Sequence, residues 1–383
     1  MTAFRTRGHP AAQAAVAAML RRHVPHAILI VGPRGIGKTT LAEDIAAGLL
    51  CAAADAAERP CGACRACRLV AGGHHPDVHR IEPVGAGRMV VIGGERSAIR
   101  PGIRDLLTGL ALAPVEGGAR VAIVTEAHRM TEDAQGALLK TLEEPGADTT
   151  IILCADVEDP ILPTIRSRSA HLRLGPVGIR DVEAVLAEAG LADPPLAARL
   201  ARLANGRPGV AVAWARRPDA VVARGQLART LLDLGDARPA ARLEAIRAAA
   251  PIAALVAGVD DPAPAPMAAA IDTGPDGSPD EADEEPVAPA RASAASRRRT
   301  TEAILRVWTE LTRDLVVVAA GVPAAARDID LLDEVRTAAA RHDLDRLTAF
   351  LERLGRATTL LAGNVSPDLI LDDLVLAWPG PKR

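Results

Sequence analysis

Residues 32–39 read GPRGIGKT, and this stretch decides how the N-terminal half of the chain folds. The apolar run Ala27–Val31 before it is typical of a buried strand, and residues 41–46 after it are typical of a helix. Strand, glycine loop and helix are the context that the phosphate-binding pattern G-x-x-x-x-G-K-[ST] requires. The glycines allow backbone N–H groups to face phosphate oxygens, Lys38 neutralises phosphate charge, and the Thr39 hydroxyl faces Mg²⁺. The alternative is a glycine turn that only resembles the motif.

The residues that we predict to bind nucleotide follow directly from this stretch. They are Gly32, Pro33, Arg34, Gly35, Ile36, Gly37, Lys38, Thr39 and Thr40.

Composition limits what else the chain does. A length of 383 residues predicts two or three domains, and a formal charge of -3 argues against a globally basic, nucleic-acid-binding surface. Aromatic residues make up 1%, with no Tyr, so platforms for base stacking are not expected. The sequence shows neither a signal peptide nor an apolar run near the ~18 residues of a membrane span. We therefore expect a cytoplasmic protein with no membrane contact.

Hydrophobic periodicity divides the chain. Apolar runs at residues 121–124 and 151–154 predict further buried strands that alternate with helices, which indicates an α/β domain with a parallel sheet covered on both faces. The pattern then becomes helical. The predicted parts are an α/β nucleotide-binding domain at 1–175, a small helical domain at 176–217, a helical domain formed by 218–257 and 299–383, and a linker at 258–298. The linker is acidic, rich in Pro and Ala, and poor in large apolar residues, which predicts disorder; an acidic or basic docking tail is the functional alternative.

Four of the five cysteines lie close together with the spacing C-x9-C-x2-C-x2-C. They are Cys51, Cys61, Cys64 and Cys67. Four thiolates with these short gaps suit tetrahedral Zn²⁺ in a closed structural site, which leaves no open position for catalysis. An iron–sulfur cluster is the rival, although the C-x3-C-P ending is missing. Unligated thiols are the remaining alternative, and Cys154 is expected to be a core residue.

Several motifs together resemble those of a bacterial clamp-loader subunit of the AAA+ class, in which the gamma/tau and delta-prime subunits of DNA polymerase III are homologous. The residues that carry the resemblance are the phosphate loop, the cysteine module, His74–Asp77, Ala137–Pro145 and Leu162–Arg168, with weaker similarity around Trp308–Leu315 and Asn364–Leu369. The resemblance implies a nucleotide-binding AAA+ domain, a helical lid at 176–217 and a helical collar for oligomerisation. It also implies ATP or ADP with Mg²⁺ as ligand, and structural Zn²⁺.

Two departures from the family's hydrolytic pattern separate delta-prime-like from gamma/tau-like subunits. Thr125 stands where the ATPase subunits carry the Asp that holds Mg²⁺, while Glu126 keeps the position of the base. Gly209 occupies the position of the lid's sensor Arg, and Arg207 is two places early. Because a hydroxyl is a poor replacement for a carboxylate beside Mg²⁺, we expect weak or absent hydrolysis, with Glu126 acting only if the chain hydrolyses at all.

The family's arginine finger is retained in Ser167-Arg168-Ser169, where Ser replaces the usual Cys. The resemblance implies that Arg168 completes the ATP site of a neighbouring subunit in trans; a surface arginine at a helix end is the alternative.

The leading hypothesis is a delta-prime-like subunit that helps to load the sliding clamp on primed DNA during replication. Its partners would be gamma/tau and delta in a heteropentamer, with clamp and DNA contacted through the complex. The alternatives are a gamma/tau-like ATP-hydrolysing motor, and a small-molecule P-loop kinase with a zinc insertion, for which no acceptor-binding region is visible.

Overall fold

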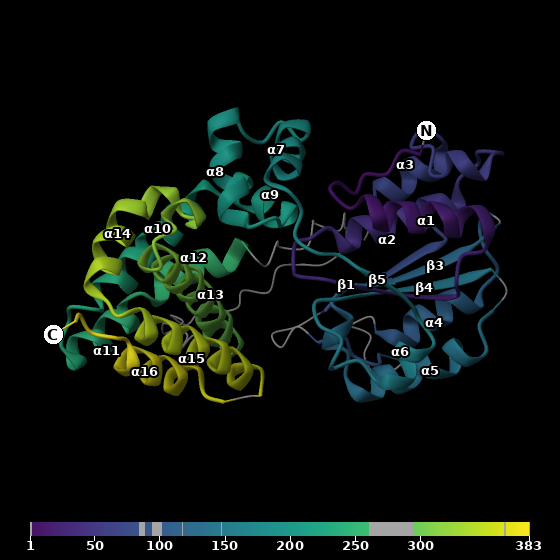
Figure 1. The fold of residues 1–383 in the computed structure, drawn as a ribbon. Helices are drawn as coiled ribbons and strands as arrows, with labels where there is room; N and C mark the ends of the chain where they lie inside the picture. Colours follow the sequence, from purple (N-terminus) through teal and green to yellow (C-terminus); the bar gives the residue numbers. More distant parts are fainter. Residues whose placement is uncertain are drawn as a thin grey trace, which may run out of the picture. The chain divides into compact units, whose positions relative to one another are not determined.

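The structure is a computed structural model of the chain, and it describes residues 2–83, 89–93, 102–116, 118–146, 148–259, 294–363 and 365–382. The chain divides into two compact units, Met1–Val212 and Ala213–Arg383. Each unit is described below by itself (Figure 1).

The first unit is built on a five-stranded sheet in the order β2-β3-β4-β1-β5, and every pairing in it is parallel. Its strands are β1 (Ala27–Val31), β2 (Val78–Ile81), β3 (Arg120–Val124), β4 (Thr149–Ala155) and β5 (Ala170–Arg173). All seven residues of β4 are buried, as expected for a parallel strand that is covered on both faces. The predicted parallel sheet is thus confirmed.

Helices cover both faces of this sheet (Figure 1). One face carries α1 (Pro10–Arg22), α2 (Lys38–Leu50) and α3 (Arg65–Ala71), and the other carries α4 (Ile103–Ala111), α5 (Glu132–Glu143) and α6 (Pro163–Ser167). Alternate side chains of β1 point to opposite faces of the sheet and so contribute to two core layers, one on each face. Ile28 and Ile30 pack with α2, whereas Leu29 packs with α4 and α5. Short 3-10 turns lie at Ala56–Glu58 and Ala127–Arg129.

Three further helices complete the first unit and lead into the second. They are α7 (Ile179–Glu188), α8 (Pro194–Ala204) and α9 (Pro208–Arg216). The Asp193 side chain caps α8 by accepting the N–H of Leu196, and Asn205 ends the helix in the left-handed conformation. The boundary between the two units falls inside α9.

The second unit is helical throughout its described residues. It contains α10 (Pro218–Asp233), α11 (Pro239–Ala248), α12 (Ala250–Val259), α13 (Ala294–Ala319), α14 (Leu332–Arg341), α15 (Leu344–Ala362) and α16 (Pro367–Ala377), with 3-10 turns at Pro323–Ala325 and Ile329–Leu331. The predicted helical C-terminal region is therefore confirmed.

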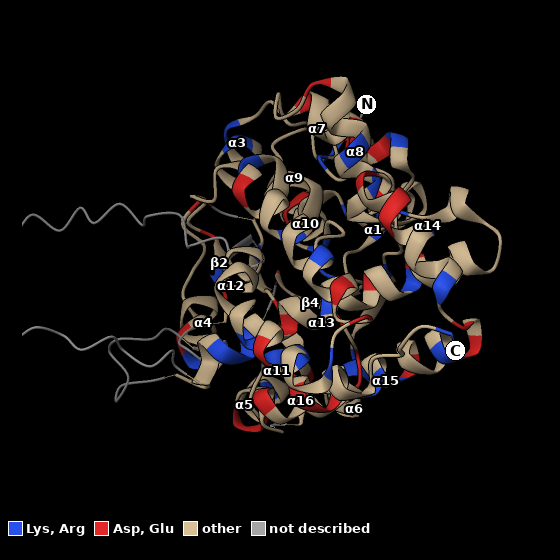
Figure 2. Ribbon diagram, turned by 90° about the vertical axis from the view of Figure 1, so that its left-hand side faces the viewer, with Lys and Arg blue, Asp and Glu red and all other residues tan. Residues whose placement is uncertain are grey.

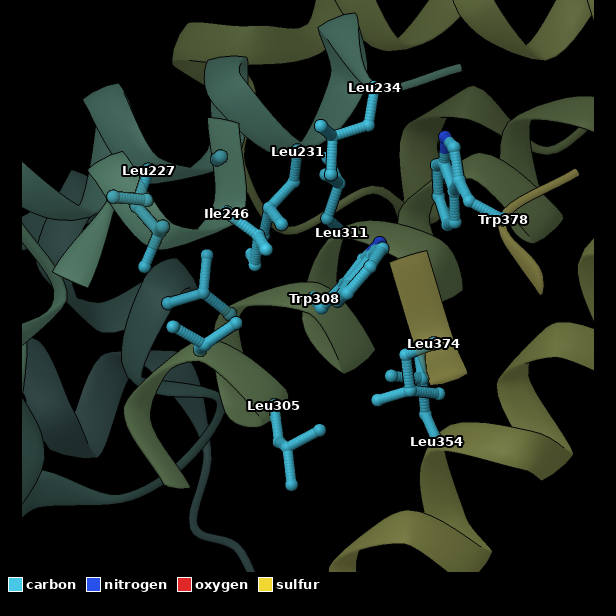
Figure 3. Packing of buried hydrophobic residues seen from close by; sticks show 14 of the residues in the cluster. Leu227, Leu231, Leu234, Ile246, Leu305, Trp308, Leu311, Leu354, Leu374 and Trp378 are labelled. Atoms are coloured by element: carbon cyan, nitrogen blue, oxygen red, sulfur yellow. The ribbon is translucent and has the colours of Figure 1, made fainter. Parts of the chain in front are cut away.

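Trp308 lies at the centre of this unit's core, as predicted (Figure 3). Its ring is fully buried, and its centroid lies 5.3 Å from the centroids of both Phe350 and Trp378. Leu311 and Leu374 fill the space around it. The aromatic cluster brings α13, α15 and the end of α16 together.

A buried ion-pair group also links helices of the second unit. The Arg224 guanidinium on α10 pairs with Glu310 on α13 and with Asp328, which follows α13 in the chain. All three side chains are largely buried, so each charge depends on the others for compensation.

The predicted linker is too long at both ends. Helix α12 runs to Val259 and α13 begins at Ala294, so residues 258–259 and 294–298 are helical. Within the first turns of α13 the Thr300 hydroxyl donates to the Ser296 carbonyl, and Arg298 pairs with Glu302. The rest of the predicted linker, residues 260–293, lies outside the described residues, as does Asn364.

Charges of both signs are interspersed along the helices of this unit, for example along α13 and α15 (Figure 2). Within the described part of the chain, no helix combines the length and apolar character needed to cross a membrane.

Candidate functional site

The parallel sheet places the ends of its strands at one edge. Strands β1, β3 and β4 are neighbours in register, and they end at Val31, Val124 and Ala155. The segments that follow them therefore begin side by side: the phosphate loop after β1, Thr125 and Glu126 after β3, and Asp156 after β4. In open α/β sheets this edge is where ligands bind.

The phosphate loop has the backbone that the motif predicts. Gly35 and Gly37 adopt left-handed φ angles of 76° and 107°. A Cβ added to Gly37 would meet nothing within 4 Å, so the loop faces open space at the point where α2 begins. The first N–H groups of α2 are thus positioned to bind an anion, and the residues present suit a nucleotide phosphate.

The Lys38 side chain is buried at this edge, and three oxygen atoms surround its ammonium. Nζ donates to the carbonyls of Gly32 at 2.7 Å and Pro33 at 3.0 Å, and to Asp156 Oδ1 at 2.6 Å. The pair with Asp156 is the shortest of these contacts. The sequence prediction did not include Asp156.

His128 holds Asp156 in this position. The Asp156 N–H donates to His128 Nδ1 at 3.1 Å, so Nδ1 carries no proton. Burial lowers the pKa of His128, although the Asp156 carboxylate acts in the opposite direction. The ring is therefore neutral at pH 7, with its proton on Nε2, 3.8 Å from Asp156 Oδ2.

The two residues at the end of β3 are both engaged by other parts of the chain. The Thr125 hydroxyl donates to the Ile81 carbonyl at 3.2 Å, toward β2. The Glu126 Oε2 lies 2.8 Å from Nε of Arg129. Glu126 also has a left-handed φ of 47°, an uncommon conformation for a residue with a side chain, and such outliers concentrate at functional sites.

Helix α9 contacts the phosphate loop directly through backbone atoms. The Gly209 N–H donates to the Gly35 carbonyl at 2.8 Å. A Cβ on Gly209 would lie 3.0 Å from that oxygen, and one on Gly35 would lie 2.7 Å from a methyl group of Val210. Two glycines thus permit the close approach. Arg207 instead donates Nε to the Ala204 carbonyl at 2.9 Å, at the end of α8.

Arg168 lies at the C-terminal cap of α6. Its side chain is 38% exposed, with one nitrogen 3.0 Å from Glu143 Oε1 and another donating to the Thr164 carbonyl at 3.2 Å. An exposed pair of this kind contributes little stability, so the guanidinium is available to a different anion.

The structure brings the four predicted cysteine ligands together. All four sulfur atoms lie within 4.8 Å of one another, at the end of α2, in the following loop and at the start of α3. The N–H groups of Cys61, Cys64 and Cys67 each lie 3.4 Å from the sulfur of another cysteine in the group. These hydrogen bonds stabilise thiolates, and the donor set could hold a metal ion.

The thiol pKa values differ among the four clustered cysteines and Cys154. Burial raises the pKa of Cys64, but the N–H of Cys67 and other hydrogen bonds outweigh it and lower the pKa to about 6. The N–H groups of Ala63 and Cys64 lower the pKa of Cys61, whereas burial raises that of Cys51 and Cys67. Burial in β4 raises the pKa of Cys154 to about 12, as expected for a core thiol.

Comparison with known proteins agrees with this arrangement. The model of the family described as "DNA polymerase III, delta subunit" matches residues 9–178. This part of the chain is similar to that family. The matched residues include the sheet, the phosphate loop and the cysteine cluster.

Curated relatives carry related names. The delta' subunit of DNA polymerase III from Pseudomonas aeruginosa is 41% identical over 143 residues, which cover 37% of this chain and 41% of the relative. The delta' subunit of Escherichia coli is 34% identical over 189 residues, covering 49% and 54%. The tau subunit of E. coli is 34% identical over 188 residues, covering 48% and 27%. The chain thus spans about half the length, or less, of these relatives.

The contact between α9 and the phosphate loop gives a testable prediction about stability. Gly209→Ala should lower the melting temperature of the full chain, by the equivalent of about 1 kcal/mol, because its Cβ forces the Gly35 carbonyl to move. The matched control is Gly136→Ala on the exposed face of α5, where a Cβ meets nothing within 4 Å. That control should raise stability by about 0.5–1 kcal/mol, as Ala replaces Gly in a helix. An equal rise in both variants, measured by thermal denaturation, would contradict the close contact.

Proposed function

We propose that this chain is a delta-prime-like subunit of the DNA polymerase III clamp loader, one that binds nucleotide but does not hydrolyse it. One observation carries the proposal. Beside a complete phosphate loop, Thr125 stands where the Mg²⁺-binding carboxylate would be, and Glu126, at the position of the base, is held in an ion pair. In this role the subunit helps other subunits to place the sliding clamp on primed DNA.

The chemistry of phosphoryl transfer explains why these two positions matter. The reaction needs Mg²⁺ to neutralise developing charge and a residue that orients the attacking water. The Thr125 hydroxyl donates a hydrogen bond to the Ile81 carbonyl and offers no negative charge to a cation. The Glu126 carboxylate is already engaged in an ion pair with Arg129, which directs it away from a water. Nucleotide would be held by Gly35, Gly37, Lys38 and Thr39, with Mg²⁺ at the Thr39 hydroxyl.

We further propose that Arg168 acts in trans on the ATP site of a neighbouring subunit. Its exposure and its weakly held guanidinium at the end of α6 support this role. The partners would be gamma/tau and delta in a heteropentamer in the cytoplasm. Residues 176–217 would serve as the lid, and the helical second unit as the collar that joins the subunits.

The metal of the cysteine cluster is proposed to be Zn²⁺ in a structural site. Four sulfur donors within 4.8 Å of one another suit its tetrahedral coordination, and all four positions are filled by the chain. Bound Zn²⁺ would fix the loop between α2 and α3 and add to folding stability.

A gamma/tau-like motor is the second candidate. The complete phosphate loop and the 34% identity to the E. coli tau subunit favour it. Hydrolysis by the isolated chain separates the two candidates.

The purified chain should release phosphate from ATP at the background rate, and Lys38→Ala should leave that rate unchanged. The reason is the absence of a carboxylate at Thr125 and the pairing of Glu126 with Arg129. A steady-state phosphate-release assay provides the measurement. Turnover that Lys38→Ala abolishes would favour the motor instead.

In a reconstituted loader, Arg168→Ala should reduce ATPase activity and lower the clamp-loading rate by about tenfold or more, since an arginine finger stabilises transition-state charge. Arg168→Lys should also be impaired, because an ammonium lacks the guanidinium fork. Arg173→Ala, which removes another exposed arginine from an ion pair, is the matched control. Assembly is checked by gel filtration; unchanged rates in intact complexes of both Arg168 variants would rule out the trans role.

Metal analysis of the purified chain should find zinc and no iron, at about one ion per chain as expected for a four-thiolate site. Cys61→Ser should lower the zinc content and the melting temperature, because it removes one of the four donors. Cys154→Ala, which changes the cysteine outside the cluster, should keep the zinc. Loss of zinc in the Cys154 variant alone, or iron in place of zinc, would contradict the assignment.

A further inference from the structure

The ammonium of Lys38 has no donor left for a phosphate in this structure. A lysine ammonium offers three N–H donors. Here they meet three oxygens, the carbonyls of Gly32 and Pro33 and the carboxylate of Asp156. A phosphate that binds to Lys38 must therefore displace at least one of them.

Asp156 is the acceptor that resembles a phosphate oxygen. It is the charged one of the three, and its Oδ1 makes the shortest contact, at 2.6 Å. Its position is also fixed from behind, because β4 ends at Ala155 and the Asp156 N–H is bound to His128. With the Lys38 side chain 9% exposed and that of Asp156 26% exposed, the pair is screened less than a surface ion pair.

Displacement of Asp156 would leave two negative groups near one lysine. The carboxylate is anchored at the end of β4, so it stays within a few ångströms of the incoming phosphate and repels it. We propose that Asp156 acts as an internal anion that occupies the phosphate-binding ammonium of Lys38 and weakens nucleotide binding at this site. This inference rests on the proposed ability of the phosphate loop to bind nucleotide.

The proposal differs from a purely structural role for the same ion pair. If the pair only stabilised the loop, removal of the Asp156 charge would leave Lys38 without a counterion and would loosen the site, so affinity would fall or stay the same. If Asp156 competes with phosphate, the same change raises affinity. The sign of the change in affinity therefore separates the two roles.

Binding of a fluorescent ADP derivative to the full chain, with and without Mg²⁺, tests the proposal. Asp156→Asn keeps the size and a hydrogen-bond acceptor but removes the charge, and it should tighten binding by about tenfold, as expected for a unit charge a few ångströms away at intermediate dielectric. Asp159→Asn makes the same charge change at an exposed position three residues further on and should have little effect. Asp156→Ser serves as a second neutral variant if the Asn variant does not fold.

Lys38→Ala provides the second half of a double-mutant cycle. In that background Asp156→Asn should give no comparable gain, because the competition takes place on the Lys38 ammonium. Tighter binding by the Asp156 variants, including binding detected only in them, supports the proposal. If the wild type binds measurably and both folded Asp156 variants bind equally or more weakly, the proposal is overturned and the nucleotide site stands. Absence of binding in the wild type and in both folded variants overturns the nucleotide site as well.

Discussion

The parallel alignment of three neighbouring strands is the constraint on which the candidate site depends. Because parallel strands end at the same edge, β1, β3 and β4 bring the phosphate loop, Glu126 and Asp156 to one place. Gly32 and Asp156 meet there although 124 positions separate them in the sequence. This arrangement needs buried apolar strands and helices on both faces, which the two core layers provide. The chemistry at the edge then follows from the residue that each strand presents after its last buried position.

At that edge the chain neutralises its own charged groups. Lys38 is paired with Asp156, and Glu126 with Arg129. In an ATP-hydrolysing site the same types of group would be directed at phosphate, Mg²⁺ and water. The backbone contact between Gly209 and Gly35 adds a further internal partner for the loop. By contrast Arg168 lies at a helix end, where its ion pair with Glu143 is exposed to solvent.

Much of this could be predicted from sequence because the relevant signals are local. The phosphate loop, the C-x2-C spacing and the buried apolar runs each depend on residues close together in the chain. Asp156 could also have been predicted, since it follows β4 as directly as Gly32 follows β1. The contact between Gly209 and Gly35 could not, because it depends on how α9 packs across 174 positions, from 35 to 209. The same holds for Arg224, whose two acidic partners come from one helix and the turn after it. Helical periodicity marked Trp308 as a core residue but did not indicate which aromatic rings surround it.

The placement of the aromatic cluster has a spectroscopic consequence. The three tryptophans, Trp214, Trp308 and Trp378, all follow residue 212, and the chain has no Tyr. The near-ultraviolet emission of the protein therefore originates from the second unit, and Trp308 and Trp378 emit from a buried, apolar environment. Unfolding of the phosphate-loop unit would leave this emission largely unchanged while the helical far-ultraviolet signal falls. The tryptophan emission thus reports on the second unit without any added label.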